Sequence, residues 1–271
     1  MTIKLVTDKK IAETSSKGNQ EKWFDSEENV WYKLDLFGYE ALAETVVSKL
    51  LKLSNIEENG IKITDYDMTK VMVHKIERTA CVSKNFLKDG EEIITIAALL
   101  RKGIGSEYIR NIEKQSSLQK KIDYIVTNVE KLTGLDGFGE YLTLLFETDM
   151  LFLNDDRHLN NIAVIRKENK FDYCPLFDYG AGLLSNIRDY PLDIEAKGMI
   201  KNVVARPFNC NFVRQMNAAE KLYGRQFEPD FTNDDVEKSL ENVDEYYSER
   251  YASDFKDRIK VCIKTQRNKY R

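Results

Sequence analysis

Two short polar segments of the chain contain the residue types needed for phosphoryl transfer. The first is Asn154-Asp155-Asp156-Arg157-His158-Leu159-Asn160-Asn161, and the second is Phe177-Asp178-Tyr179-Gly180. Together they place carboxylates and a carboxamide on both sides of a predicted hairpin. Carboxylate and amide oxygens can hold Mg²⁺ on a nucleoside triphosphate, and a carboxylate that does not bind the metal can orient and deprotonate an attacking hydroxyl.

Asp156 is the residue that we expect to act as the base. The preceding apolar segment 138–153 predicts a buried helix, which would support Asp156 rigidly at the helix end. Asn161 lies five residues further and opens a predicted strand, and Asp178 lies just before Gly180, whose flexibility lets the carboxylate turn toward the same point. A catalytic Asp, a later Asn and a metal-binding Asp before Gly follow the order found in protein kinases, so we expect Asn161 and Asp178 to bind Mg²⁺.

The neighbours of Asp156 have other expected roles. Asp155 would be the base if the register shifted by one residue. We expect His158 to fix the loop by hydrogen bonding rather than to accept the substrate proton, and Arg157 to pair with a loop carboxylate. Either polar segment alone is more typical of a helix cap or a hairpin exit. The presence of both segments in this order favours catalysis, because a strand-rich region with a suitable lysine precedes them.

The N-terminal region offers groups that could bind a nucleotide. Lys33 ends a β-rich run, and Glu40 and Glu44, one turn apart on the next predicted helix, can each pair with it; the sequence does not decide between them. Residues 80–86, with Cys81 and Ser83, occupy the place of a hinge whose backbone would bind the adenine edge. A polar loop ahead of these elements can aim backbone N–H groups at phosphate, and it contains Ser15, Ser16, Lys17, Gly18, Asn19 and Gln20.

The pattern of apolar residues divides the chain into two lobes and predicts an α+β protein. Strands are expected at residues 3–6, 22–24, 30–34, 61–64, 71–76 and 80–87. Helices are expected over 38–53, 107–132, 138–153, 193–203, 209–223 and 235–265, with a hairpin at 161–176. A small β-rich N-lobe, residues 1–88, would therefore precede a larger helical C-lobe, residues 89–271.

Composition argues against several classes of protein. The chain has 271 residues and a net charge of −4, which gives no electrostatic reason to expect nucleic acid as a partner. No run of about eighteen apolar residues occurs, so no membrane span is expected, and the N-terminus lacks the apolar region of a signal peptide. Four cysteines without C-x-x-C spacing and only two histidines argue against a zinc site, a disulfide framework and a histidine-rich metal centre.

Four segments together resemble the HipA-like serine/threonine kinases, most of all their short bacterial forms of the cell-translocating kinase type. They are Trp31-Tyr32-Lys33, Gly38-Tyr39-Glu40-Ala41-Leu42-Ala43-Glu44 and the two segments that contain Asp156 and Asp178. The resemblance implies a bilobal protein-kinase-like fold that uses ATP and Mg²⁺, with Lys33 as the ATP lysine and residues 181–208 as the activation segment. It also implies that Gly18 and its neighbours form the phosphate loop, with Ser15 and Ser16 as candidate autophosphorylation sites. Tyr179 replaces the phenylalanine of the usual kinase motif.

The leading hypothesis is an ATP- and Mg²⁺-dependent kinase that phosphorylates serine or threonine in an unidentified protein. One alternative is a lipid or small-molecule kinase, since the Asp-Arg-His order is shared with lipid kinases. Another is a pseudokinase or toxin-associated binding module, against which the intact trio of Asp156, Asn161 and Asp178 argues. We expect a bacterial cytoplasmic protein, with non-classical secretion as an effector as the alternative.

Overall fold

A five-stranded sheet forms the small part of the molecule. The structure is a computed structural model, and it describes residues 4–6 and 21–270. The strand order is β1-β4-β5-β3-β2; all neighbours are antiparallel except β1 and β4. The strands are β1 (Lys4–Val6), β2 (Lys22–Asp25), β3 (Val30–Leu34), β4 (Asp67–Val73) and β5 (Ile76–Lys84).

Two tight turns set the register of this sheet. In the turn between β2 and β3, the Asp25 carboxylate accepts a hydrogen bond from the Glu27 N–H at 3.0 Å. Between β4 and β5, His74 and Lys75 both have positive φ, 50° and 64°, as a type I′ hairpin turn requires. The sequence predicted a strand over 71–76, which this turn interrupts. Trp23 stacks on Tyr32 with ring centroids 5.4 Å apart, so cross-strand aromatic packing fixes β2 against β3.

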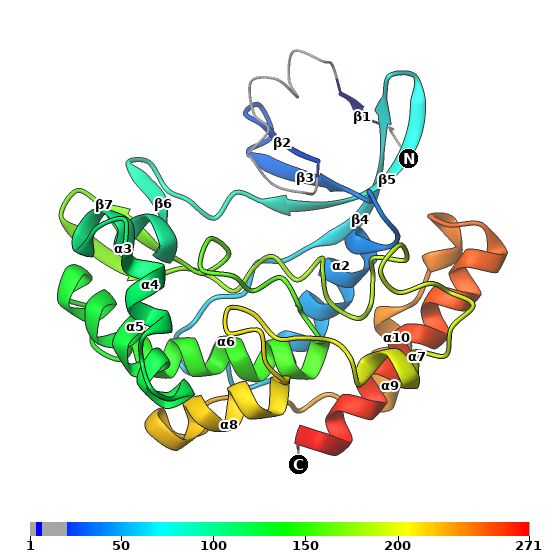
Figure 1. The fold of residues 1–271 in the computed structure, drawn as a ribbon. Coiled ribbons are helices and arrows are strands. Elements are labelled where there is room, and N and C mark those ends of the chain that lie inside the picture. The colour runs from blue at the N-terminus through cyan, green and yellow to red at the C-terminus, as the bar shows by residue number, and fades with distance from the viewer. Residues whose placement is uncertain (1–3, 7–20, 271) are drawn as a thin grey trace.

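Helix α2 (Glu40–Leu51) lies between the small sheet and the helical part (Figure 1). Every residue of α2 except Lys49 is buried. A helix that is enclosed on all sides is fixed by packing rather than by its own propensity. Its position therefore depends on both parts of the molecule.

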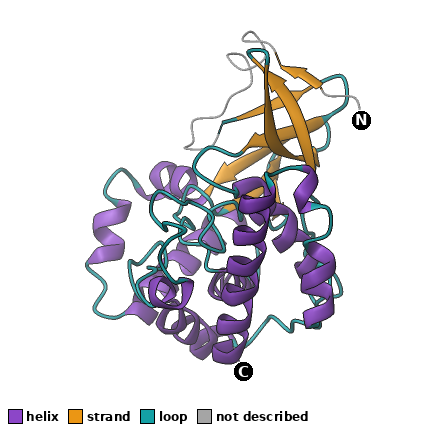
Figure 2. Cartoon of the chain, turned by 90° about the vertical axis from the view of Figure 1, so that its right-hand side faces the viewer, coloured by secondary structure: helices purple, strands orange, loops and turns teal. Residues whose placement is uncertain are grey.

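The larger part is helical and contains a second, three-stranded antiparallel sheet of order β6-β7-β8. Figure 2 shows the small sheet at one end and the helices at the other. The predicted fold class, α+β with a small β-rich part and a larger helical part, is confirmed. The elements are β6 (Glu91–Thr95), α3 (Ile96–Ile104), α4 (Tyr108–Glu113), α5 (Leu118–Thr133), α6 (Phe138–Phe152), β7 (Ala163–Lys167), β8 (Lys170–Tyr173), α7 (Ala196–Ile200), α8 (Phe212–Tyr223), α9 (Asn233–Ser239), the 3-10 helix η1 (Val243–Glu245) and α10 (Glu249–Tyr270).

Helix α6 is the centre of the helical part. All its residues except Glu140 are buried, as the apolar sequence predicted. One hydrophobic core includes residues of α2, α6 and α10. The two sheets draw their strands from opposite sides of residue 88, but this core continues across that position. No helix within residues 4–6 and 21–270 is long and apolar enough to cross a membrane.

Several predicted elements differ from the structure. The differences arise at helix caps and at strands that pair with distant parts of the chain. The helix expected over 107–132 is interrupted before Ser117, whose hydroxyl caps α5 by accepting the Lys120 N–H at 3.2 Å. The helix expected over 235–265 is three elements, and residues 61–64 form an isolated bridge rather than a strand. Helix α3 was not predicted. Strand β6 was not predicted either, because it is formed by pairing with the distant β7.

Candidate active site

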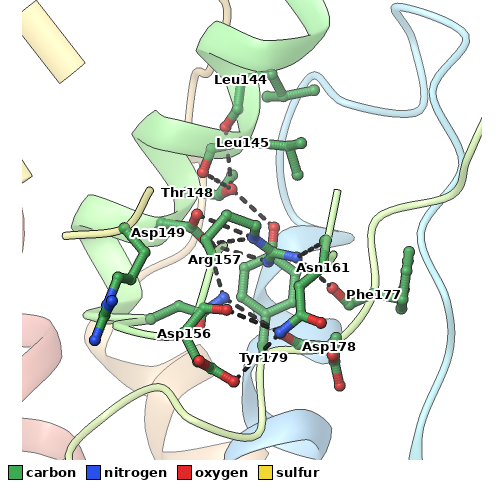
Figure 3. Close-up of polar contacts among 12 residues, drawn as sticks. Leu144, Leu145, Thr148, Asp149, Asp156, Arg157, Asn161, Phe177, Asp178 and Tyr179 are labelled. Atoms are coloured by element: carbon green, nitrogen blue, oxygen red, sulfur yellow. Dashed lines mark hydrogen bonds and ion pairs between the residues drawn. The ribbon is translucent and has the colours of Figure 1, made fainter. Parts of the chain in front are cut away.

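The two polar segments lie side by side because β7 and β8 pair antiparallel. The first segment follows the end of α6 and leads to β7, and the second follows β8. Leu153 ends α6 in a left-handed conformation, φ 55°, which turns the chain sharply into the first segment. The predicted hairpin thus places both segments next to each other (Figure 3). After the roles that the sequence predicts for them, we call them the catalytic loop, residues 154–161, and the metal loop, residues 177–180.

Arg157 joins both loops to α6 (Figure 3). Its side chain is 1% exposed, and its Nε and Nη2 atoms each donate to the Asp149 carboxylate at 3.0 Å. Its Nη1 atom donates to the carbonyls of Asn161 at 3.1 Å and Phe177 at 2.9 Å. The expectation that Arg157 pairs with a loop carboxylate is wrong, since its partner lies in α6. Asp149 was missed, although a lone Asp in an apolar helix is the signal that could have found it.

Asp178 adopts a left-handed backbone conformation with φ 66°, which is rare for a residue other than Gly, Asn and Asp. Asn154 stabilises it by donating from Nδ2 to the Asp178 carbonyl at 3.2 Å and to Asp149 at 2.9 Å. Tyr179 follows with its hydroxyl 2.8 Å from that of Thr148. Tyrosine in place of phenylalanine therefore adds a buried hydrogen bond to α6. Contacts on both sides of Asp178 thus fix its left-handed conformation.

Asp156 faces Asn161 and the metal loop. The Asn161 Nδ2 atom donates to the Asp156 carbonyl at 2.8 Å and to its Oδ2 atom at 3.3 Å. Burial raises the pKa of Asp156, and the negative charge of Asp178 raises it further. A carboxylate with a raised pKa is a better proton acceptor, so this environment suits a general base.

His158 and Asp155 have different partners. The backbone of His158 donates to the Asp156 carbonyl at 2.8 Å, and its Nε2 atom lies 3.7 Å from Asp156 Oδ1. Asp155 instead accepts a hydrogen bond from the Tyr190 hydroxyl, and burial raises the pKa of Asp155 to about 6. Of the two candidate bases, Asp156 is thus the one that contacts Asn161 and is influenced by Asp178.

Lys33 connects the small sheet to the metal loop. Its Nζ atom donates to Glu44 Oε1 and, at 2.8 Å, to Asp178 Oδ1. The second oxygen of Glu44 accepts the Tyr179 N–H at 2.8 Å, so Glu44 contacts both Lys33 and the metal loop. Burial alone would raise the pKa of Asp178, but the positive charges of Lys33 and Lys22 and the hydrogen bond from Lys33 together hold that pKa below its usual range.

Glu44, and not Glu40, is the partner of Lys33. The Glu40 carboxylate accepts backbone hydrogen bonds from Leu36 at 3.2 Å, Phe37 at 2.7 Å and Gly38 at 3.1 Å. It therefore stabilises the turn that leads into α2, and the alternative in which Glu40 pairs with Lys33 is wrong. Spacing along the helix could not separate the two glutamates because the difference arises from contacts with distant loops.

Lys22 is a cation at this site that the sequence reasoning missed. It lies directly opposite Lys33 in the β2–β3 ladder, so both side chains project from the same face of the sheet. Burial and then the charge of Lys33 lower its pKa, while Asp178 opposes this effect. No ion pair joins Lys22 to a residue of the described ranges. Once the hairpin register is assumed, cross-strand pairing with Lys33 would have identified it.

Two of the remaining predicted nucleotide-binding residues, Cys81 and Ser83, lie on β5. Cys81 lies in the middle of β5, paired with Lys33 on one side and Met68 on the other, so the sheet occupies its backbone groups. The prediction that its backbone binds adenine is wrong. Ser83 pairs only with β3, beyond the end of β4. Residues 85–90 link β5 to β6. Ser15, Ser16, Lys17, Gly18, Asn19 and Gln20 lie outside the described residues.

The side chains of Asn161 and Asp178 fit a magnesium ion. Asn161 uses its Nδ2 atom for Asp156, which leaves the amide oxygen available, and Asp178 binds Lys33 through only one carboxylate oxygen. No cluster of three or more His, Cys, Asp or Glu side chains suited to a metal occurs in the described part of the chain. Mg²⁺ on a nucleotide needs fewer protein ligands, because phosphate and water oxygens complete its shell.

Comparison with known proteins gives a match in fold. No family model and no curated protein matches the chain. The crystal structure of the proinflammatory kinase CtkA of Helicobacter pylori is similar, with a TM-score of 0.58 at 14% identity over 94% of this chain and 89% of that chain. HipA of Shewanella oneidensis MR-1, solved with HipB and operator DNA, matches with a TM-score of 0.41 at 12% identity over 93% and 65% of the two chains. The likeness to CtkA confirms the kinase-like fold that the sequence motifs implied.

Proposed function

We propose that this protein is an ATP- and Mg²⁺-dependent serine/threonine protein kinase of the HipA-like type. The observation that carries the proposal is the bridge from Lys33 to both Glu44 and Asp178, with Asp156 and Asn161 beside it. This arrangement combines a cation for phosphate, a carboxylate that positions the cation, a metal-binding pair and a free base. Phosphoryl transfer requires this combination. The HipA-like kinase fold supports the same assignment.

Each side chain has a defined role in the proposed reaction. When bound, Mg²⁺ would neutralise charge on the β- and γ-phosphates between Asn161 and Asp178. Lys33 binds phosphate oxygens, since one of its three N–H donors remains after Glu44 and Asp178 are satisfied. Asp156 orients the substrate hydroxyl and accepts its proton as the phosphoryl group is transferred.

Lys22 extends the positive charge on the nucleotide side of the site. Two lysines on one face of a sheet repel each other, and a triphosphate between them would offset this repulsion. We therefore assign Lys22 to the phosphates as well.

The proposal is tested by binding and mass measurements on the full chain. ATP with Mg²⁺ should raise the melting temperature, and incubation with ATP should add 80 Da per phosphate if Ser15 or Ser16 is autophosphorylated. Asp156→Ala should abolish transfer from labelled ATP and keep nucleotide binding, because Asp156 acts on the hydroxyl. Transfer at the wild-type rate by this variant would refute the assignment. ATP binding without transfer to any protein would favour a non-catalytic module instead.

A further inference from the structure

The C-terminal segment contacts α2 and the small sheet as well as the helical part. In Figure 1 the orange-to-red α10 ends among the helices of the larger part. Residues 246–255, which we call the C-terminal brace, follow η1 and contain the start of α10. The brace contacts the segment between β3 and α2, which connects Lys33 to Glu44.

Two tyrosines of the brace form hydrogen bonds with the small sheet and with the segment that follows β3. The Tyr247 hydroxyl donates to Asp35 Oδ2 at 2.7 Å, and Asp35 Oδ1 accepts the N–H of Ala41 in the first turn of α2 at 2.7 Å. The Thr79 hydroxyl donates to the Tyr246 carbonyl at 2.9 Å, and the Tyr246 hydroxyl donates to the Met68 carbonyl at 3.2 Å. The brace is thus bonded to β4, to β5 and, through Asp35, to α2.

Aromatic packing adds an apolar contact at the same place. Phe255 of α10 lies 4.4 Å from the Tyr39 ring and 5.1 Å from the Tyr247 ring, centroid to centroid. Tyr39 is fully buried, immediately precedes α2 and donates from its hydroxyl to the Leu183 carbonyl at 2.7 Å. A change in the position of Phe255 would therefore be transmitted to the first turn of α2.

The remainder of α10 is fixed to the helical part. Gln266 donates to the Met150 carbonyl of α6 at 2.6 Å, and the Tyr270 hydroxyl donates to the Phe227 carbonyl at 2.7 Å. Arg258, which is 5% exposed, donates to the Pro191 carbonyl at 2.7 Å. Since α10 is anchored in this way, its N-terminal end can hold α2 at a fixed distance from the catalytic loop.

We propose that the C-terminal brace holds α2 where Glu44 meets Lys33, with Tyr247 as a positioning residue. Glu44 also binds the Tyr179 N–H, so a shift of α2 would disturb Lys33 and the metal loop together. The chain would thus assemble its own Lys33–Glu44 pair with a C-terminal element and would need no separate partner for this step. The catalytic meaning of the brace rests on the proposed kinase function, whereas its effect on α2 can be measured independently.

Hydrogen exchange tests the effect on α2. Tyr247→Phe removes one hydroxyl and keeps the ring, and Thr79→Val removes the bond to the Tyr246 carbonyl. One hydrogen bond is worth about a factor of ten in an equilibrium, so each variant should raise exchange of α2 amides about tenfold and leave α6 unchanged. Tyr251→Phe is the matched control, because Tyr251 stacks on the same Phe255 and is 48% exposed. Equal exchange of α2 in wild type and both variants would overturn the proposal.

Enzyme kinetics test whether the brace acts through Glu44. In the wild-type background, Tyr247→Phe combined with Thr79→Val should lower kcat several-fold at saturating ATP. In a Glu44→Gln background the same pair should have no further effect on kcat, because the contact that the brace positions is already lost. The positioning role would be overturned if the double substitution lowered kcat by the same factor in both backgrounds. An unchanged kcat in the wild-type background would overturn it as well. A wild-type protein without transfer activity would refute the kinase function, and the exchange measurement would still decide whether the brace holds α2.

Discussion

At the residue scale, the two loops are held together by groups that take no part in the proposed chemistry. Arg157 contacts Asp149 and two backbone carbonyls, and Asn154 contacts Asp149 and Asp178. These side chains are almost fully buried, so their hydrogen bonds are made within the protein rather than to water. The catalytic residues can remain partly exposed because these buried neighbours fix the backbone around them.

Arg157→Met should therefore destabilise the protein strongly. Removing one partner of a buried ion pair leaves the Asp149 carboxylate uncompensated, which typically costs about 3–5 kcal/mol of unfolding free energy. Arg166→Met is the matched control, because Arg166 pairs with Glu92 at the surface and such pairs contribute about 0–1 kcal/mol. Urea denaturation of both variants measures the difference. Similar losses in the two would contradict the structural role of Arg157.

Lys22→Met should weaken binding of ATP and leave binding of adenosine unchanged. A partly buried cation that contacts phosphate contributes only to ligands with phosphate, and a charge-assisted hydrogen bond is worth about 1.5–3 kcal/mol, or roughly 10- to 100-fold in affinity. Lys70→Met, on β4 of the same sheet, is the control, since Lys70 pairs with Glu77. Calorimetric titration with ATP, AMP and adenosine separates the charge effect. An equal loss for all three ligands would indicate a general disturbance of the sheet.

At the element scale, the start of α2 is bonded to the segment that follows the metal loop. Gly38 forms a bridge with Asn186, the Tyr39 N–H donates to the Ser185 carbonyl at 3.2 Å, and the Ile187 N–H donates to the Phe37 carbonyl at 3.1 Å. A Cβ atom on Gly38 would lie 1.9 Å from the Ser185 carbonyl oxygen. Glycine is thus required here by the close approach of two backbones.

Gly38→Ala should separate α2 from this segment and lower both stability and activity. The clash involves backbone atoms, so relief requires a shift of the chain, and we expect a loss of about 1–3 kcal/mol in unfolding free energy. Gly198→Ala in α7 is the control: a Cβ atom there meets nothing within 4 Å, and alanine favours a helix interior by up to about 1 kcal/mol. Thermal unfolding of the two variants should shift in opposite directions. A neutral Gly38→Ala would show that the bridge is not needed.

Elements that are determined by their own sequence could be predicted. Elements that depend on pairing with distant parts of the chain could not. The buried α6, the β7–β8 hairpin and the order of Asp156, Asn161 and Asp178 could be inferred from apolar runs and turn residues. The choice of Glu44 over Glu40 could not, since it is decided by the metal loop far along the chain. Strand β6 and the brace are likewise defined by partners remote in sequence. Lys22 shows an intermediate case, in which the register of one hairpin would have been enough.

At the scale of the whole molecule, two carboxyl groups with raised pKa values link stability to pH. Burial raises the pKa of Asp35, which directly follows β3, to about 8, and that of Glu147, on α6, also to about 8. In the unfolded chain both groups titrate near pH 4, by the usual values of about 3.9 and 4.3. From about pH 4 to pH 8 the folded protein therefore retains protons that the unfolded chain has released.

The free energy of unfolding should consequently fall as the pH rises from 5 to 8. The neutral carboxyls stabilise the fold fully only below the pKa that they have in the unfolded chain. This stabilisation is lost as the pH rises through the pKa that they have in the folded protein. The slope is up to about 1.4 kcal/mol per pH unit for each group. Asp35→Asn and Glu147→Gln should each reduce this slope, whatever their effect on stability at a single pH. Because one hydrophobic core runs from α2 through α6 to α10, both substitutions should act on the same cooperative transition in urea. Two separate transitions, with Asp35→Asn altering the slope of only one, would instead show that the lobes unfold independently and that the brace does not couple them.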